Sequence, residues 1–335
     1  MTQLESLTPS LHEDKALSIS IYKLENKALW DNFVSKAKNG IFLFYRDYIE
    51  YHSDRFQDHS LLFFKDGNLV GLLPANLDHH TLHSHAGLTF GGVISSYDMT
   101  QSLMLGIFDK LIEHCKKEGI TQGIYKAIPH IYHSVPADED LYALFRNNAK
   151  LIGRNLSSSI FLLEKGPFDS RRKESLRKAK KNGLVVERSY DLKSFMALAE
   201  FILMEKHGVR PVHTVEELAP LMSRFPENIK LFVSSKQDIM MSGIVIYESE
   251  NVAHGQYAAN SNIGRTIGAQ DIIEDYLINE YYKDKRYFDF GISTIKLGRE
   301  LNEGLLTRKE GFGASAINYD FYELIFSQKE SHEGI

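Results

Sequence analysis

Two segments in the last third of the chain contain the residue types needed to acylate an amine. Lys309 lies in the charged run RKE at 308–310, and Asp289 lies in the otherwise aromatic segment RYFDFGIS at 286–293. A cation such as Lys309 can stabilise the oxyanion that forms when an amine attacks a thioester or ester carbonyl. The attacking amine must be neutral, so another group has to accept its proton. Asp289 and Glu248, which ends the apolar strand-like segment 244–247, are the candidate bases.

Each of these residues also has a purely structural interpretation. Lys309 would then be a solvated lysine in a surface run, and Glu248 a solvated strand end. Asp289 would bond to nearby backbone groups.

A glycine-containing segment before a helix-like stretch is the candidate donor site. It reads SNIGRTIGAQ at 261–270. Free backbone N–H groups at a helix N-terminus stabilise anions such as the pyrophosphate of coenzyme A, and an arginine can pair with phosphate. The alternative is a plain loop before a surface helix. The expected donor contacts are Gln256, Tyr257, Ala258, Arg265, Gly268 and Ala269.

Four residues nearer the N-terminus are the candidate acceptor contacts. Arg46 and Arg55 suit a bidentate phosphate contact, and structural ion pairing is equally compatible with their surroundings. His85 and Tyr97 are expected to line the acceptor pocket, with simple surface exposure as the alternative. Four histidines gather at 79–85, but further metal ligands are missing from this stretch, so no metal is expected.

A basic run, SRRKESLRKAKKNG, occupies 170–183. It could contact a nucleotide diphosphate or the backbone of tRNA, or it could be a solvated helix face. The whole chain carries a net charge of −5, which argues against general nucleic-acid binding.

The composition is that of an ordinary globular protein, with 43 % hydrophobic and 25 % charged residues. The apolar stretches are far shorter than the roughly 20 residues of a membrane-spanning helix, and the polar N-terminus lacks the features of a secretory signal. We therefore expect a cytoplasmic protein. The single cysteine, Cys115, is expected to be a buried small hydrophobe on the apolar face of a helix.

The same order of elements is predicted twice along the 335 residues. An apolar hairpin, a strand, a helix and a strand follow each other from Leu62, and the same succession starts again at Leu231. A further helix precedes each copy, at 26–38 and at 191–206. The pattern predicts an α/β fold with mixed sheets in two similar units, divided near the turn pair Gly166-Pro167.

Several of these segments resemble the FemAB-like acyltransferases of the acetyltransferase (GNAT) superfamily. The strand at 286–293, the later KEGFGA at 309–314, the basic run at 170–183 and SHAGLTFGG at 84–92 carry the likeness, which extends from about residue 46 to 322. The GNAT phosphate loop, Arg/Gln-x-x-Gly-x-Gly/Ala, is matched only in its first part, because Gln270 stands where a small residue belongs. The resemblance implies an N-terminal tail at 1–16, an acceptor-side GNAT-like domain at 17–166 and a donor-side GNAT-like domain at 167–328.

The resemblance implies an N-acyltransferase, with acetyl-CoA as the expected donor. The expected acceptor is an amino group on an amino-sugar or nucleotide-sugar precursor of a cell-surface polysaccharide or related envelope molecule. One alternative is a FemAB-type aminoacyltransferase that transfers from aminoacyl-tRNA to a peptidoglycan precursor. A non-catalytic binding protein is the other alternative. No nucleic acid other than aminoacyl-tRNA is expected as a partner.

Overall fold

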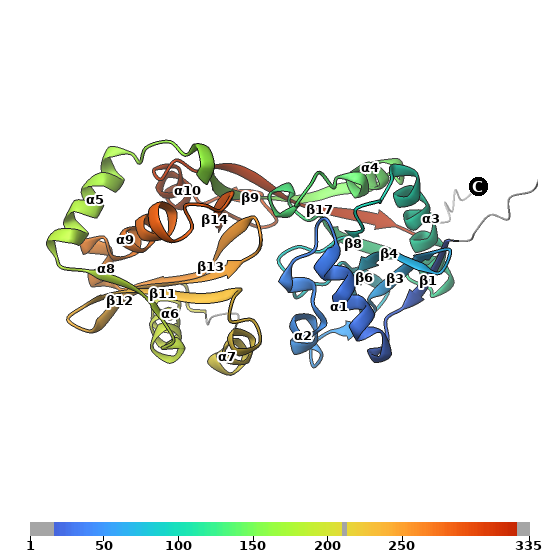
Figure 1. Ribbon diagram of the computed structural model, residues 1–335, viewed down its shortest axis with the longest axis horizontal. Helices are drawn as coiled ribbons and strands as arrows, with labels where there is room; N and C mark the ends of the chain where they lie inside the picture. Colours follow the sequence, from blue (N-terminus) through green and yellow to red (C-terminus); the bar gives the residue numbers. More distant parts are fainter. Residues whose placement is uncertain (1–16, 210–212, 327–335) are drawn as a thin grey trace, which may run out of the picture.

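A computed structural model describes residues 17–209 and 213–326, so the tail expected at 1–16 lies outside the described residues. The chain forms two α/β units that lie side by side (Figure 1). The helices of the first unit are α1 (Lys27–Lys36), α2 (Arg46–Ile49), α3 (Gln101–Lys117) and α4 (Glu139–Arg146), with short turns η1 (Leu24–Asn26), η2 (Phe42–Phe44), η3 (Glu50–His52) and η4 (His130–Tyr132). Its strands are β1 (Leu17–Ile21), β2 (Gln57–Asp58), β3 (Leu61–Lys65), β4 (Asn68–Leu73), β5 (Asn76–Asp78), β6 (Thr81–His83), β7 (Ile94–Ser95) and β8 (Gln122–Lys126).

The second unit repeats the hairpin, strand, helix and strand order. Its helices are α5 (Ser170–Lys181), α6 (Leu192–His207), α7 (Val215–Arg224), α8 (Asn262–Ile267), α9 (Ala269–Tyr276) and α10 (Glu303–Glu310), with the 3-10 turn η5 (Leu162–Glu164) and the π-helical turn η6 (Leu277–Tyr281). Its strands are β10 (Val185–Ser189), β11 (Ile229–Lys236), β12 (Ile239–Glu248), β13 (Val252–Asn260), β14 (Tyr287–Ile292), β15 (Thr294–Ile295) and β16 (Glu300–Leu301). Two long strands, β9 (Lys150–Phe161) and β17 (Ser315–Ile325), extend between the units.

The helices predicted before and inside each unit are present because their sequences carry both an apolar face and a cap. The Thr100 side chain accepts a hydrogen bond from the backbone N–H of Leu103 and starts α3. Asp191 caps α6 in the same way, and α6 ends at Gly208 in the left-handed conformation. Cys115 is buried on the apolar face of α3, as predicted, and burial raises the pKa of its thiol to about 12.

One sheet of eleven strands runs through both units, in the order β10-β11-β12-β13-β14-β9-β17-β8-β6-β5-β2. A second sheet, β1-β3-β4-β7, lies in the first unit. Strand β9 follows the first unit in sequence, yet its end pairs with β14 of the second unit. Strand β17 is the last strand, and it pairs with β9 and with β8 of the first unit. The two units are therefore joined by main-chain hydrogen bonds between segments far apart in sequence.

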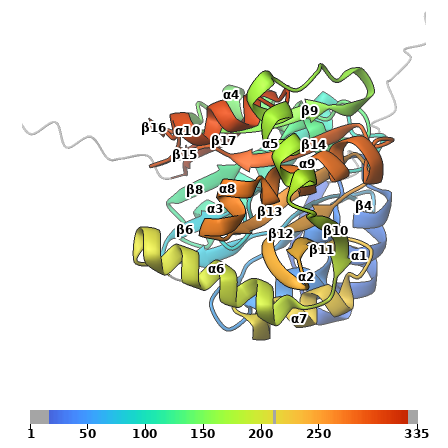
Figure 2. The same ribbon diagram turned by 90° about the vertical axis from the view of Figure 1, so that its left-hand side faces the viewer.

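Helices cover both faces of the sheet in the second unit. Helices α6 and α7 pack on one face, against β13, β12 and β11, and α9 packs on the other with α5 outside it (Figures 1 and 2). This arrangement leaves the ends of β13 and β14 enclosed between α6, α8, α9 and α10 (Figure 2).

An aromatic cluster fills the junction of the two units. The ring centroid of Phe42, from the first unit, lies 5.4 Å from that of Tyr247 and 5.6 Å from that of Phe225 in the second. The Tyr48 hydroxyl donates to the Tyr247 hydroxyl at 3.3 Å. Buried aromatic pairs of this kind add about 0.5–1.5 kcal/mol each beyond the area that they bury. The junction is therefore a continuous apolar core.

The strand expected after the first hairpin, HSHAGLTFGGVI at 83–94, is irregular over most of its length, and only its two ends belong to strands, His83 to β6 and Ile94 to β7. Its glycines explain the difference. Gly92 has φ +94°, and a Cβ at Gly91 would lie 2.2 Å from the Ser84 carbonyl oxygen. The segment folds back on itself more closely than a side chain would allow, and this close approach replaces strand pairing.

Candidate active site

A cavity of about 600 Å³ opens where β13 and β14 diverge. The two strands pair in parallel only from Val252–Tyr287 to His254–Asp289, and β12 shifts register against β13 between Val245 and Ile246. Beyond His254, the edge of β13 that faces β14 has no partner strand in the described sheet. The cavity is lined by Thr89, Ile202, Leu203, Ile244, His254, Gly255, Gln256, Ala258, Arg265, Gln270, Glu274, Phe288, Phe290, Gly291, Ile292, Leu305, Arg308, Lys309 and Tyr319.

A histidine backed by a buried carboxylate lies in the wall of this cavity. The Nδ1 atom of His254 is 2.7 Å from Oδ2 of Asp289, which is fully buried. Tyr319 also donates to Oδ2 at 2.7 Å, and Ser157 donates to Oδ1 at 2.7 Å. Burial alone would raise the pKa of Asp289, but the hydrogen bonds and charge of His254, with those from Ser157 and Tyr319, hold it below its usual value.

This arrangement determines which nitrogen of His254 can react. An ionised Asp289 only accepts hydrogen bonds, so Nδ1 carries the proton and donates it. Nε2 is then the nitrogen that can accept a proton, and no hydrogen-bond partner for Nε2 is found within residues 17–209 and 213–326. The pair has the geometry of a general base and its orienting carboxylate.

A bulge in β14 gives His254 its space. Gly291 has φ +78°, and a Cβ there would come within 3.4 Å of Cε1 of His254. Strand β14 shifts its register against β9 between Asp289 and Ile292. A residue with a side chain at Gly291 would be strained and would press on the imidazole.

Lys309 reaches the same cavity from α10, but its ammonium group already has three hydrogen-bond partners. Nζ donates to the carbonyl oxygens of Gly291 at 2.7 Å and Ile292 at 2.9 Å, and to Oγ of Ser293 at 2.9 Å. Burial lowers the pKa of Lys309 to about 8, against the opposing charges of Asp289 and Glu274. The side chain holds the end of β14 in place, and a direct contact with an oxyanion would require Nζ to give up one of these bonds.

A buried ion cluster joins α5, α9 and α10 beside the cavity. Arg308 pairs with Asp271 at 2.8 Å and also with Glu274, and Arg172 pairs with Asp271 at 2.6 Å. Burial raises the pKa of Glu274, although Arg308 opposes the shift. The first turn of α9 therefore contains a carboxylate held by two arginines.

The glycine segment expected to be an open loop is the short helix α8. Its amides have partners inside the chain, since Gly264 N–H donates to the Ser261 side chain, Arg265 N–H to Ser261 O, and Gly268 N–H to Gly264 O. Gly268 and Ala269 are buried, and a Cβ at Gly268 would lie 2.5 Å from the Ser175 carbonyl oxygen of α5. The segment therefore closes the hydrogen bonds of these three amides itself, and Ala269, Gln270 and Asp271 then form the first turn of α9.

The remaining donor-side residues separate into two groups. Gln256, Ala258 and Arg265 line the cavity. Tyr257 points away from it, and its hydroxyl forms a hydrogen bond with Nδ1 of His213.

Glu248, the second candidate base, does not line the cavity. Its carboxylate binds Lys230 at 2.7 Å, Lys285 at 2.9 Å and the Tyr282 hydroxyl at 3.1 Å. Burial raises the pKa of Glu248, but the hydrogen bonds and charges of Lys230 and Lys285 outweigh it and hold the pKa below its usual value.

The four candidate acceptor residues lie outside this cavity. Arg46 is buried, pairs with Glu50 at 3.1 Å and with Asp58, and its guanidinium lies 3.7 Å from the ring centroid of Tyr22. These contacts give Arg46 the structural role that was the alternative to phosphate binding.

The other three acceptor candidates are also held by protein groups. Arg55 pairs with Glu217 of α7 at 2.9 Å. His85 is buried, with its ring centroid 5.5 Å from that of Phe56. Tyr97 is 60 % exposed and its hydroxyl lies 2.9 Å from Oγ of Ser134.

His254, Tyr319 and Ser157 are the site residues that the sequence analysis missed. A usable signal was present for His254. Side chains alternate along a strand, so the face that carries Gln256 and Ala258 also carries His254, whereas Tyr257 faces the other way. No local pattern points to Tyr319 or Ser157, because both reach Asp289 through the pairing of β9 with β14 and β17.

The comparisons with known proteins bear on the fold. No family model and no curated protein matches the sequence. The structure is similar to that of FemX, with a TM-score of 0.65, 15 % identity and coverage of 92 % of this chain and 97 % of that chain. It is also similar to L-PGS from Bacillus licheniformis, with a TM-score of 0.56, 12 % identity and 92 % of each chain covered. A conserved protein of unknown function from Bacteroides thetaiotaomicron matches with a TM-score of 0.55 and 10 % identity over 92 % of this chain and 100 % of that chain.

These similarities confirm the predicted fold, two α/β units with mixed sheets in an arrangement similar to that of FemX. Among the described residues, no helix is long and apolar enough to cross a lipid bilayer.

Proposed function

Starting from this tandem GNAT-like fold, we propose that the protein is an N-acyltransferase that forms an amide in the cavity between β13 and β14. The observation that supports this proposal is the pair formed by His254 and the fully buried Asp289 in the cavity wall. An acceptor amine beside Nε2 of His254 would lose its proton to that nitrogen while it attacks the acyl carbonyl. Asp289 would stabilise the imidazolium that forms.

In this proposal the amine attacks the acyl donor directly. Among the described residues the only cysteine is buried inside the first unit, and no serine side chain hydrogen-bonds to His254. The carbonyl oxygen gains negative charge in the transition state and needs donors. Backbone N–H groups along the unpaired edge of β13, near Gln256 and Ala258, would supply them. Lys309 would keep β14 away from that edge through its bonds to Gly291 and Ile292.

Acetyl-CoA is the first donor that we propose. An extended pantetheine arm can follow the unpaired edge of β13 much as a strand would, and this would place its thioester near His254. Arg265, exposed in the cavity lining, would meet a phosphate. The acceptor would approach from the first unit, where Thr89 and Phe90 share a narrow apolar extension of the site with His254 and Gln256. An amino group of a sugar precursor for a surface polysaccharide remains our proposed acceptor.

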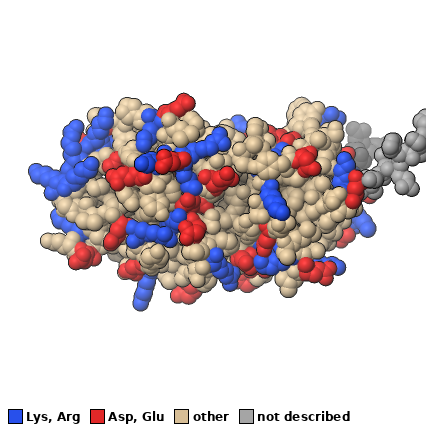
Figure 3. Space-filling model, viewed as in Figure 1, with Lys and Arg blue, Asp and Glu red and all other residues tan. Residues whose placement is uncertain are grey.

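Two observations favour aminoacyl-tRNA as a second candidate donor. The amides of Gly264, Arg265 and Gly268 are already bonded within the chain, so these three N–H groups are not available to a pyrophosphate. In addition, Lys and Arg side chains gather at the end of the molecule formed by α5 (Figure 3), where Arg171, Lys173, Arg177, Lys178, Lys180 and Lys181 are exposed. That surface would suit the phosphates of a tRNA.

A calorimetric titration with acetyl-CoA separates the two donors. We expect saturable binding that weakens about tenfold in Arg265→Ala, because a phosphate contact of this kind contributes about 1.5 kcal/mol. The matched control is Arg146→Ala, since Arg146 is exposed at the end of α4 and hydrogen-bonds only to Tyr142 in the described structure. Absence of binding by the wild type would contradict acetyl-CoA. Aminoacyl transfer from charged tRNA, lost after ribonuclease treatment, would then identify the second donor.

Turnover decides between an enzyme and a non-catalytic binding protein. With the donor identified in that way, amide formation on an amino sugar such as glucosamine should be detectable and should be lost in His254→Gln. If neither donor is consumed with any amine, the protein is not an acyltransferase.

A further inference from the structure

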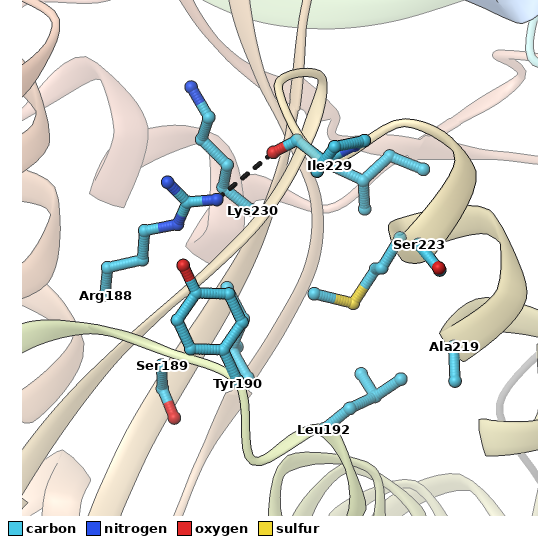
Figure 4. Close-up of a pocket in the computed structure, with 11 residues that line it drawn as sticks. Arg188, Ser189, Tyr190, Leu192, Ala219, Ser223, Ile229 and Lys230 are labelled. Carbon is cyan, nitrogen blue, oxygen red and sulfur yellow. Dashed lines mark hydrogen bonds between the residues drawn. The ribbon is translucent and has the colours of Figure 1, made fainter.

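A second cavity lies in the second unit, away from the one between β13 and β14. It has a volume of about 390 Å³ and is bounded by the connection from β10 to α6, by α7 and by the start of β11 (Figure 4). Its lining shares no residue with the cavity that contains His254. A volume of this size is sufficient for a small-molecule ligand.

The inner wall of this second cavity is apolar. Leu192 of α6 and Leu231 of β11 are both buried, and Met222 of α7 also lines the cavity. Figure 4 shows Leu192 and Ala219 of α7 on the same side of the cavity. Burial of an apolar group against such a wall contributes roughly 25 cal/mol per Å². The wall therefore favours the ring or alkyl part of a ligand.

A cation without an acidic partner lies at the mouth. One Nη of Arg188 donates to the Pro226 carbonyl oxygen at 3.1 Å, and no carboxylate lies within ion-pair distance of Arg188 in the described part of the chain. A guanidinium has five N–H donors, so most of them remain available to a ligand. Lys230, the other cation of the lining, pairs with Glu248 at 2.7 Å and with Glu227 at 3.8 Å, and Glu248 also pairs with Lys285. The cavity thus presents one uncompensated positive charge.

An exposed aromatic ring stands beside that charge. Tyr190 is 78 % exposed, and the Arg188 guanidinium lies 5.3 Å from its ring centroid. The stacking restricts the arginine and orients its planar donor fork. A planar carboxylate is the anion that such a fork binds with two parallel hydrogen bonds.

We propose that this cavity binds a small amphipathic carboxylate, with its apolar body against Leu192, Met222 and Leu231 and its carboxylate on Arg188. The site is separate from the acyl-transfer site and does not depend on the proposed reaction. A carboxylate with a single ring or a short alkyl chain has the dimensions and the charge that the cavity accommodates.

The test is a fluorine NMR titration of the full chain with para-trifluoromethylbenzoate, compared with the matching neutral alcohol. We expect saturable binding of the carboxylate and at least about tenfold weaker binding of the alcohol, as expected for loss of a charge-assisted hydrogen bond. Arg188→Met should weaken carboxylate binding by a similar factor. The control Arg146→Met should not change it.

A second variant tests the cavity by filling it with a bulky side chain, without changing any charge. Ala219→Trp places a large ring at an exposed position of α7 that borders the cavity, so it should abolish binding without disturbing the core. Absence of saturable binding by the wild type would overturn the proposal. Equal affinity for the alcohol, or unchanged binding by Arg188→Met or Ala219→Trp, would also overturn it.

Discussion

Replacing Asp289 by asparagine tests the role of the buried carboxylate at nearly constant side-chain volume. In the native site Oδ2 accepts from His254 and Tyr319, and Oδ1 accepts from Ser157, each at 2.7 Å. An asparagine offers one oxygen and one NH₂ group, so at least one of these donors faces another donor in either orientation. The negative charge beside a protonated His254 is also lost.

The two consequences differ in magnitude and can be measured separately. A general base contributes about 10²–10⁴-fold to the rate, which corresponds to about 3–5 kcal/mol of activation free energy. We expect kcat of Asp289→Asn to fall by that factor, because the imidazolium that forms at His254 loses its anionic partner. The unpaired donor costs about 1–3 kcal/mol of folding free energy, less than the 5–15 kcal/mol typical of a folded domain.

The assay measures product formation with the donor that binding identifies, while circular dichroism checks the fold. His254→Gln should lose a similar factor, and the double variant should lose little more, because the two residues act as one unit. Ser157→Ala is the control, since it removes one hydrogen bond to Asp289 and leaves the bond from His254. A folded Asp289→Asn protein with kcat within tenfold of the wild type would refute the reasoning. Losses that multiply in the double variant would refute it as well.

Three further sets of substitutions test the surroundings of the site by urea unfolding. Burial lowers the pKa of Lys309 from about 10.5 to about 8. Between these two pH values the unfolded chain therefore binds more protons than the folded chain. The free energy of unfolding of the wild type should rise relative to that of Lys309→Met from pH 7 to 10, by up to about 3 kcal/mol. Arg308→Met should lower the free energy of unfolding by about 3–5 kcal/mol, because Asp271 and Glu274 lose the arginine that pairs with both. Adding Glu274→Gln should restore part of this stability. Gly268→Ala should lower the free energy of unfolding by more than about 1–2 kcal/mol, because φ is +80° and the new Cβ would lie 2.5 Å from a backbone oxygen of α5. Gly166→Ala is the control and should change the free energy of unfolding little, because nothing lies within 4 Å of a Cβ at that position.

Each set has an outcome that contradicts it. A stability difference between wild type and Lys309→Met that is independent of pH would mean that Lys309 does not titrate in this range in the folded chain. Full stability of Arg308→Met would show that the two carboxylates are solvated. Equal effects of the two glycine substitutions would remove the argument for close packing at Gly268.

Much of the fold could be predicted because its elements are encoded locally. Helix α3 has an apolar face and a threonine cap, and α6 has an aspartate cap and a terminal glycine. The hairpin β11–β12 is an apolar pair of strands around a polar turn. The irregular segment before β7 could not be predicted from apolar content, because close backbone approach at Gly91 and Gly92 outweighs it.

The candidate site was predictable only in part. Asp289, Lys309, Gln256, Ala258 and Arg265 were identified from residue type and position, and the structure brings them to one cavity or directly beneath it. The chemical detail of those residues depended on neighbours. Lys309 is hydrogen-bonded to three oxygens of the chain, and Asp289 is hydrogen-bonded to a histidine.

The sequence by itself determined the properties that depend on residues close together in the chain. These include the helices and hairpins, the burial of Cys115, the basic surface of α5 and the aromatic strand that carries Asp289. Periodicity and capping act within a few residues and are therefore visible in one sequence.

Only the tertiary structure decided which distant segments meet. Ser157 on β9 and Tyr319 on β17 are separated by 132 and 30 residues from Asp289, yet both donate to its carboxylate. Their meeting depends on the register of β9 between β14 and β17. Register is set by the packing of whole sheet faces, and a shift of one residue would turn each side chain to the opposite face.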